Sequence, residues 1–146
     1  MVEFKEITVD NYENCLNLKV AANQNNFVAS NTYSLAQAWV YTAYPFAIYA
    51  GDVMVGFIMM GYYKPKDRYS IWRLMIDERF QGKGYGKAAL LLAIKYLKEK
   101  HNVKEIFLSF DPSNIIAEKL YSDAGFQRTG EIEDGEVVMC LRCPHL

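Results

Sequence analysis

One short segment carries the most specific pattern of the chain: Leu74-Met-Ile-Asp-Glu-Arg-Phe-Gln81-Gly-Lys-Gly-Tyr-Gly86. Its glycines at positions 82, 84 and 86 allow a sharp turn and a close approach of the backbone to a ligand. Apolar side chains spaced three and four apart then predict a long helix from about Lys83 to His101. N–H groups at the start of such a helix, together with Lys83 and Lys87, favour a phosphate. The expected buried face of the helix contains Leu90, Leu91, Ile94 and Leu97.

Two common phosphate-binding motifs do not fit this loop. A Walker loop needs a glycine where the chain has Gln81 and a hydroxyl where it has Ala88. A dinucleotide fingerprint is nominally met by residues 84–89, but it should lie in the first strand–helix–strand unit and precede an acidic residue at the end of the next strand. Here the loop follows several predicted strands, and the nearest acidic residue, Glu105, begins its strand. Both motifs are therefore excluded.

The remaining elements alternate in a way that is typical of an α/β protein. Asp10 with Glu13 resembles a capping box and predicts a helix to about Val20, and Ser34 with Gln37 predicts a short helix that Pro45 ends. Residues 21–33 are rich in amides and are expected to form a functional loop. Another helix is expected at 114–124, and strands at 2–9, 46–50, 53–63, 69–76, 104–110, 126–132 and 137–142. This order predicts a mixed sheet with helices on its faces.

Composition limits the class of protein. The chain has 146 residues, 51% of them apolar, and a net charge of -1, which fits a single domain over residues 1–146. Balanced charge argues against nucleic acid or a membrane as partner, and the absence of a leader pattern or a spanning segment predicts a cytoplasmic protein. Three cysteines without a paired metal motif predict reduced thiols and no metal site, Cys140-Leu-Arg-Cys143 included.

A second motif follows about 30 residues after the glycine loop: Asn114-Ile-Ile-Ala117-Glu-Lys-Leu-Tyr121-Ser-Asp-Ala-Gly125-Phe126. Together the two segments resemble the GCN5-related N-acetyltransferase family, whose motifs are Gln/Arg-x-x-Gly-x-Gly/Ala and Asn-x-x-Ala-x-x-x-Tyr-x-x-x-Gly-Phe. The predicted element order agrees with that family across nearly the whole chain. The resemblance implies an enzyme that transfers acetyl directly from acetyl-CoA to a primary amine, without a metal.

The resemblance also implies where each substrate binds. Strands 69–76 and 104–110 would be parallel and splayed, with the pantetheine arm of acetyl-CoA in the gap between them. Tyr121 lies seven residues after Asn114 and therefore on the same helix face, where it would protonate the departing thiolate. The implied cofactor-binding residues are Leu74, Met75, Ile76, Gln81, Gly82, Lys83, Gly84, Tyr85, Gly86, Lys87 and Asn114.

The segments 27–31, 34–38 and 74–86 resemble the bacterial spermine/spermidine (diamine) acetyltransferase branch of that family. Segment 21–33 would then line an amine channel, and the near-zero net charge would average an anion-binding and a cation-binding end of one cleft. In one branch of the family a glutamate lies six residues before the position of Ile76, where this chain has Ser70, so the general base is left to Glu78, Asp77 or a water chain that leads to an acidic loop residue. The candidate acceptor contacts are Phe27, Asn31, Tyr33 and Glu78.

Several alternatives remain open at this point. The acceptor could instead be a protein or peptide amine, or another small amine, and the chain could be a non-catalytic acyl-CoA-binding regulatory domain. Similar proteins commonly pair through sheet edges or the C-terminal hairpin, so a homodimer is also an open alternative.

Overall fold

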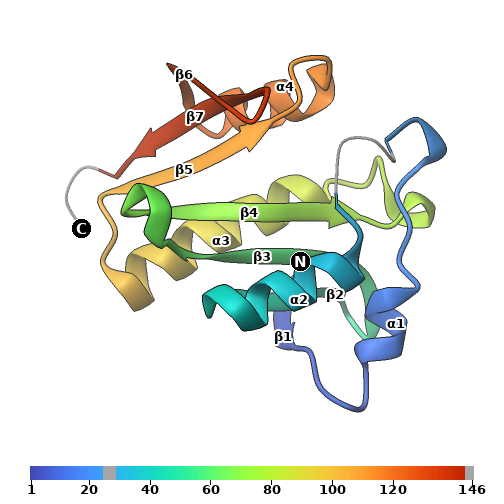
Figure 1. Cartoon of the computed structure of the whole chain (residues 1–146). Coiled ribbons are helices and arrows are strands. Elements are labelled where there is room, and N and C mark those ends of the chain that lie inside the picture. The colour runs from blue at the N-terminus through green and yellow to red at the C-terminus, as the bar shows by residue number, and fades with distance from the viewer. Residues whose placement is uncertain (25–28, 144–146) are drawn as a thin grey trace.

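The computed structural model describes residues 1–24 and 29–143, and its elements form a mixed seven-stranded sheet with helices on both faces (Figure 1). The strand order is β1-β2-β3-β4-β5-β7-β6, in which β4 and β5 are parallel and the other neighbours antiparallel. The α/β class and the predicted order of strands and helices are confirmed. The strands are β1 (Glu3–Glu6), β2 (Tyr44–Ala50), β3 (Val53–Tyr63), β4 (Arg68–Ile76), β5 (Glu105–Phe110), β6 (Gln127–Glu133) and β7 (Glu136–Arg142).

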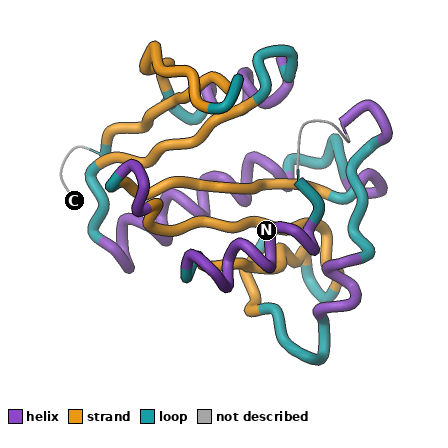
Figure 2. The backbone as a smooth tube through the Cα atoms, in the orientation of Figure 1, coloured by secondary structure: helices purple, strands orange, loops and turns teal. Residues whose placement is uncertain are grey.

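Four α-helices and three short 3₁₀ turns connect these strands (Figure 2). The helix α3 lies across one face of the sheet, and α1 and α2 lie on the other. No helix in the described ranges is long and apolar enough to cross a membrane. The helices are α1 (Tyr12–Leu16), α2 (Asn31–Tyr41), α3 (Tyr85–His101) and α4 (Ile115–Asp123), and the turns are η1 (Ala22–Gln24), η2 (Lys64–Lys66) and η3 (Glu78–Phe80).

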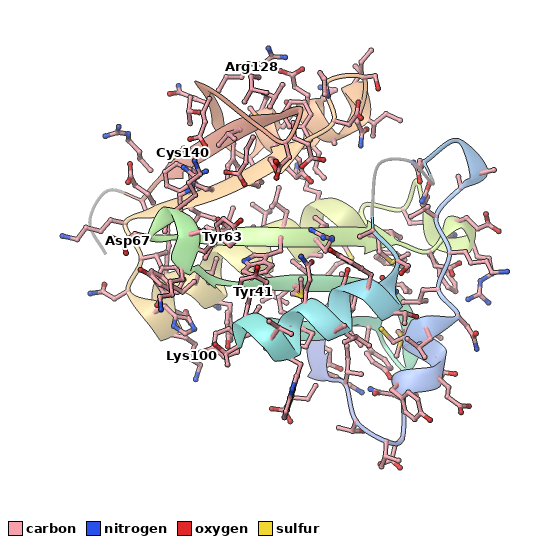
Figure 3. All side chains as sticks on the ribbon, in the orientation of Figure 1. Tyr41, Tyr63, Asp67, Lys100, Arg128 and Cys140 are labelled. Carbon is pink, nitrogen blue, oxygen red and sulfur yellow. The ribbon has the colours of Figure 1, made fainter. Side chains whose placement is uncertain are left out.

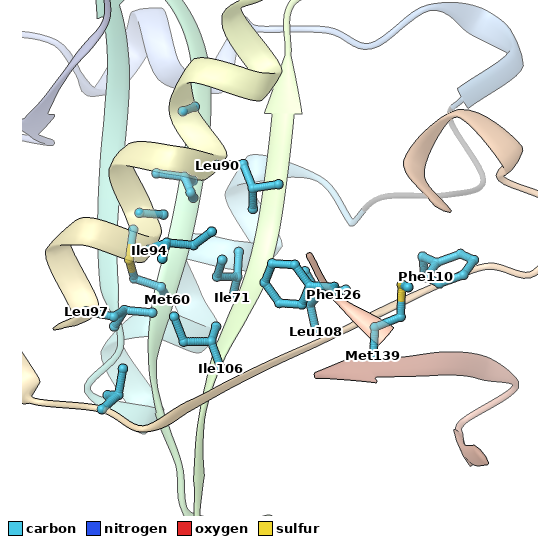
Figure 4. Packing of buried hydrophobic residues seen from close by; sticks show 14 of the residues in the cluster. Met60, Ile71, Leu90, Ile94, Leu97, Ile106, Leu108, Phe110, Phe126 and Met139 are labelled. Carbon is cyan, nitrogen blue, oxygen red and sulfur yellow. The ribbon is translucent and has the colours of Figure 1, made fainter. Parts of the chain in front are cut away.

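Strand β3 is buried on both sides because helices cover both faces of the sheet. On one side Ile58 and Met60 belong to the cluster that contains Leu90, Ile94 and Leu97 of α3 (Figure 4). On the other side, alternate β3 residues pack with α1 and α2; this second cluster contains Phe57, Met59, Cys15, Leu18 and Ala38. The sheet is therefore a closely packed middle layer, which provides a firm support for the strands beside β3.

The parallel pair β4–β5 is joined at a single register position, Ser70 opposite Phe107, and the two strands then diverge toward their C-terminal ends (Figure 1). In the β3–β4 pairing, Met59 lies opposite Arg73 while Met60 lies opposite Ile71, so Trp72 is an extra residue on β4. Such a bulge bends its strand and turns the side chains that follow it. The splay predicted for strands 69–76 and 104–110 is confirmed.

The N-terminal capping predictions were wrong in detail. The helix α2 begins after Ser30, whose Oγ accepts a hydrogen bond from Tyr33 N at 3.1 Å, and Ser34 lies fully buried inside the helix. Because residues 21–33 contain many polar side chains, the sequence did not single out Ser30 as the N-cap. In α1 the N-cap is Asn11 rather than Asp10, and the Asn11 side chain instead accepts from Thr8 N at 2.8 Å.

Other boundaries also differ from the predictions. Pro45 lies inside β2, because α2 already ends at Tyr41 with Thr42 in the left-handed conformation (φ 55°). Leu91 is 49% exposed, since only a narrow stripe of α3 faces the sheet. The first strand covers Glu3–Glu6 rather than residues 2–9, and α1 stops at Leu16, well before Val20.

A buried carboxylate fastens the chain after α1 to the end of β4. Asp77 is 2% exposed and accepts hydrogen bonds from Lys19 N (3.0 Å), Arg79 N (3.0 Å) and Arg79 Nε (2.8 Å). Glu78 N donates in turn to Lys19 O at 2.7 Å. Burial alone would raise the pKa of Asp77, but hydrogen bonds from Arg79 and Lys19 outweigh it and hold the pKa below its ordinary value.

Replacing the Asp77 carboxylate should make the free energy of unfolding less dependent on pH in the acidic range. We expect Asp77→Asn to lower the free energy of unfolding by about 2 kcal/mol near pH 7, because hydrogen bonds to a buried charge are lost. Because the pKa of Asp77 is lower in the folded than in the unfolded chain, its ionised carboxylate stabilises the fold at pH values above the unfolded-state pKa. This stabilisation is lost as the pH falls through the folded-state pKa. The deficit should therefore shrink below about pH 4 in urea unfolding measured across pH.

The neighbouring carboxylate provides the control for this measurement. Glu78 is exposed, so Glu78→Gln should change the free energy of unfolding by less than about 0.5 kcal/mol. An Asp77→Asn deficit that stays constant from about pH 7 to pH 3 would contradict the role given to the charge.

Candidate active site

A cavity of about 860 Å³ lies where β4 and β5 diverge, bounded by the glycine loop and by α4. Its size is in the range of cofactor sites in proteins. Of the implied cofactor-binding residues, Lys83 alone is absent from its lining, and Lys83 is exposed on the loop. The implied residues that do line the cavity are Leu74, Met75, Ile76, Gln81, Gly82, Gly84, Tyr85, Gly86, Lys87 and Asn114, and Tyr121 lines it with them.

The glycine loop needs glycine for its backbone conformation. Gly82 (φ 78°) and Gly84 (φ 84°) are left-handed, and a Cβ at either would meet nothing within 4 Å. Gly84 is the N-cap of the 17-residue helix α3, so the loop presents the free N–H groups of a helix start beside this cavity. The helix dipole and Lys87 give this end of the cavity a positive potential.

The Gln81 side chain, which lines this cavity, also holds the loop in place. Its Nε2 donates to Ile76 O at the end of β4 and to Gln24 Oε1 in η1, both at 2.9 Å. The loop is thereby fixed to β4 and to the segment after α1 by one amide.

Asn114 and Tyr121 enter the cavity from α4. Asn114 is the N-cap of this helix, and its Oδ1 accepts from Ala117 N at 3.1 Å. The Tyr121 ring lies between Phe110 and Phe126, with both ring centroids 6.1 Å away. Burial, and then the Glu136 carboxylate, raise the pKa of Tyr121 to about 12, so its phenol keeps its proton at neutral pH.

A second cavity, of about 310 Å³, adjoins the first. Part of its lining is aromatic: the Trp72 ring meets the Tyr63 ring edge-on at 5.2 Å, and Tyr41, which does not line the cavity, packs edge-on against Trp72 at 5.4 Å (Tyr41 and Tyr63 are labelled in Figure 3). Another part is acidic, with Glu133, Asp134 and Glu136 from the β6–β7 hairpin. The residues that line both cavities are Ile71, Trp72, Arg73, Ser109 and Glu136.

The two arginines of the second cavity differ in their partners, since Arg68 pairs with carboxylates and Arg73 donates to neutral oxygens and keeps its positive charge. Arg68 pairs with Glu131 (3.0 Å) and Glu133 (3.2 Å), and its guanidinium lies over the Phe107 ring at 4.2 Å. Arg73 donates to Trp72 O at 2.7 Å and to Gln37 Oε1 at 2.8 Å. Within residues 1–24 and 29–143, Asp134 and Glu136 join no ion pair shorter than 4.0 Å, so they remain available to a cation.

The pKa of Tyr63 shows the same acidic surroundings. Burial first, and then the Glu133 carboxylate, raise the pKa of this phenol above its ordinary value. Negative charge nearby disfavours the phenolate form of Tyr63, and the same negative charge favours a cation in this cavity.

The candidate acceptor contacts fall in different places. Tyr33 lines the second cavity, whereas Asn31 is 7% exposed and its Nδ2 donates to Cys15 O at 2.8 Å. Glu78 lies on η3 and lines neither cavity, and Phe27 lies outside the described residues. Asp77, a candidate base, is fully used by the hydrogen bonds described above.

Several polar cavity residues were missed by the sequence interpretation, among them Arg73, Ser109 and Glu136, which line both cavities. These three come from three strands and share no local motif, so only the sheet order brings them together. His101 is remote from them, stacked among Tyr44, Tyr69 and Tyr96. The thiols of Cys15, Cys140 and Cys143 are free, and Cys15 and Cys143 lie in different hydrophobic clusters.

Comparison with known proteins agrees with this geometry. Residues 10–126 match the model of the acetyltransferase (GNAT) family. The chain is 38% identical to a spermine/spermidine N(1)-acetyltransferase of Bacillus subtilis (strain 168) over 146 residues, 94% of this chain and 96% of the relative. It is 36% identical, with the same coverage, to a probable spermine N(1)-acetyltransferase of Bacillus subtilis subsp. natto.

Solved structures share the fold at lower identity. The PaiA N-acetyltransferase of Thermoplasma acidophilum, in complex with coenzyme A, superposes with a TM-score of 0.75 at 17% identity, over 98% of this chain and 99% of that one. Spermidine N-acetyltransferase of Vibrio cholerae, in complex with CoA and spermine, gives 0.74 at 16% identity, over 95% and 92%. The chain belongs to the acetyltransferase (GNAT) family and is an N-acetyltransferase with acetyl-CoA as its acetyl donor, as the two motifs had indicated.

Proposed function

We propose that this enzyme acetylates a primary amine of a polyamine such as spermidine or spermine, with acetyl-CoA in the larger cavity and the polyamine in the smaller one. The observation that carries the proposal is the meeting of the two cavities at Trp72, Arg73, Ser109 and Glu136. The similarity to relatives named for spermine and spermidine supports the same acceptor class.

The larger cavity has the groups that the donor requires. Backbone amides and carbonyls of 74–76 lie along a strand without a partner on that side, and they would bind the pantetheine amides. The N–H groups of 81–86, at the start of α3, would bind the pyrophosphate together with Lys87. Asn114 would hydrogen-bond the same arm from α4.

The smaller cavity has the groups that an extended polycation requires. Carboxylates of Glu133, Asp134 and Glu136 lie along one wall, and the rings of Tyr63 and Trp72 offer cation–π contacts on another. A chain of methylenes with spaced ammonium groups matches such alternating acidic and aromatic surfaces. Tyr33 would contact the acceptor at the outer end.

Tyr121 is the proposed general acid. The amine nitrogen would attack the acetyl carbonyl carbon, the C–S bond would break, and the Tyr121 hydroxyl would donate its proton to the departing thiolate. Its buried phenol is protonated at neutral pH, as this role requires. No covalent intermediate with the enzyme is needed.

Removing the Tyr121 hydroxyl should slow the chemical step and leave donor binding intact. We expect Tyr121→Phe to lower kcat about 10²-fold, with the Kd for acetyl-CoA changed by less than about threefold. Coenzyme A release and calorimetric titration measure the two quantities. The control is Tyr96→Phe, which alters another partly buried tyrosine outside both cavities. An unchanged kcat in Tyr121→Phe would remove this residue from the mechanism.

The acceptor class is tested by coenzyme A release across spermidine, spermine, short diamines, a monoamine, amino acids and lysine peptides. We expect the highest kcat/KM with spermidine or spermine. Turnover of peptides without turnover of polyamines would overturn the proposal. Acetyl-CoA binding without turnover of any amine would instead favour a regulatory acyl-CoA-binding domain.

A turn carboxylate distinguishes polyamine binding from simple amine binding. Asp134 has a positive φ of 51°, which asparagine adopts readily, so Asp134→Asn removes charge with little strain. We expect the KM for spermine to rise about tenfold and the KM for a monoamine to stay within about twofold, because a monoamine lacks the second ammonium. Asp52→Asn, in the exposed β2–β3 turn, is the matched control. Equal changes for both amines would contradict the assignment.

A further inference from the structure

Glu136 is the acidic residue that lines both cavities. It is the first residue of β7, it is half-buried, and its Oε1 accepts a hydrogen bond from Ser109 Oγ at 2.8 Å. Ser109 is near the end of β5, opposite Val138 in the sheet. The carboxylate is thus held at the junction of the donor and acceptor spaces by a neighbouring strand.

No ion pair within 4.0 Å neutralises this carboxylate in the part of the chain that the structure describes. The Arg73 guanidinium of β4 carries a positive charge close enough to interact with this carboxylate, although Arg73 donates its hydrogen bonds to Trp72 O and Gln37 Oε1. Tyr121 faces it from α4, and its phenol is neutral. Glu133 lies opposite in the β6–β7 pair and is matched by Arg68, while Asp134 lies in the turn beside it and Tyr33 comes from α2.

We propose that Glu136 is the catalytic base of the acetyl transfer, positioned by Ser109. This inference rests on the proposed function only in that the amine enters through the second cavity. Glu136 and Tyr121 both line the larger cavity. One group can therefore accept the proton of the attacking nitrogen while the other donates a proton to the departing sulfur. The alternatives considered from the sequence, Asp77 and Glu78, line neither cavity.

The proton balance of the step is complete without any further reagent. The ammonium first loses one proton to solvent, and the free amine donates an N–H hydrogen bond to the Glu136 carboxylate. The nitrogen then forms its bond to the acetyl carbonyl carbon, and its acidified proton passes to Glu136 as the C–S bond breaks. Tyr121 gives a proton to the thiolate and regains one from water, and Glu136 releases its proton to water.

The test is Glu136→Gln, which keeps the shape of the side chain and an oxygen that can accept from Ser109. At saturating amine near pH 7 we expect kcat to fall about 10²-fold, with the KM for acetyl-CoA within about twofold. The deficit should narrow several-fold near pH 9.5, because hydroxide then takes the nitrogen proton. Glu136→Asp, which keeps a carboxylate, should recover part of the lost kcat, and Ser109→Ala should lose only a few-fold.

Glu105→Gln is the matched control, since Glu105 lies on β5, outside both cavities, and the variant removes the same charge. A rise in the KM for the amine with unchanged kcat would overturn the base assignment and leave a binding role. A kcat deficit that is independent of pH, or equal in Ser109→Ala, would also overturn it.

The two proposals fail in different ways. All variants are assayed with the best acceptor of the amine panel, whichever class it belongs to. A wild-type enzyme that turns over another amine but no polyamine contradicts the proposed function, and Glu136 is then tested on that amine. A wild-type enzyme that turns over spermidine while Glu136→Gln keeps its kcat contradicts the base alone.

Discussion

The single register pair between β4 and β5 is the constraint on which the rest of the site depends. Beyond Ser70 and Phe107 the two parallel strands separate, so backbone groups on the facing edges lack a strand partner in the described structure. Buried peptide groups without partners are costly, and a ligand with amides along its length can satisfy them. The strands are held apart by what lies behind them: α3 packs under β4, while β7 and β6 extend the sheet beyond β5. The gap is therefore a property of the whole sheet.

Charge is divided along this gap. The start of α3, with Lys87, makes one end attractive to phosphate, and the β6–β7 turn, with Glu133 and Asp134, makes the other end acidic. The net charge of -1 is a sum over the whole chain and carries no information about such a local division. The arginines near the acidic end reduce its negative charge without cancelling it: Arg68 is matched by Glu131 and Glu133, and Arg73 brings one positive charge against the two carboxylates of Asp134 and Glu136.

Local signals in the sequence were sufficient for most of the fold and brought out the two segments that line the larger cavity. The glycine loop and the Asn114–Tyr121 spacing are contiguous patterns that depend on backbone conformation and helix period, and both segments line the larger cavity. The polar residues around the smaller cavity could not be predicted from local patterns. Glu136 is 27 residues from Ser109 and far from Arg73 in the chain, and the three meet only because β7 inserts between β5 and β6. The cap at Ser30 was missed for a smaller reason, since several neighbouring polar residues could have served equally well.

The same insertion of β7 has a consequence for the order in which the enzyme becomes competent during synthesis. A chain emerging from the ribosome completes β3, β4 and α3 early, and this half of the sheet already contains the glycine loop. The antiparallel neighbour of β5 is β7, which follows β6 in the chain. Strand β5 therefore gains this neighbour only after β6 has been made. Until then the acidic wall and the residue facing Tyr121 are absent. A nascent chain would thus acquire the half of its cleft that contains the glycine loop well before the half that contains the acidic residues of the β6–β7 hairpin.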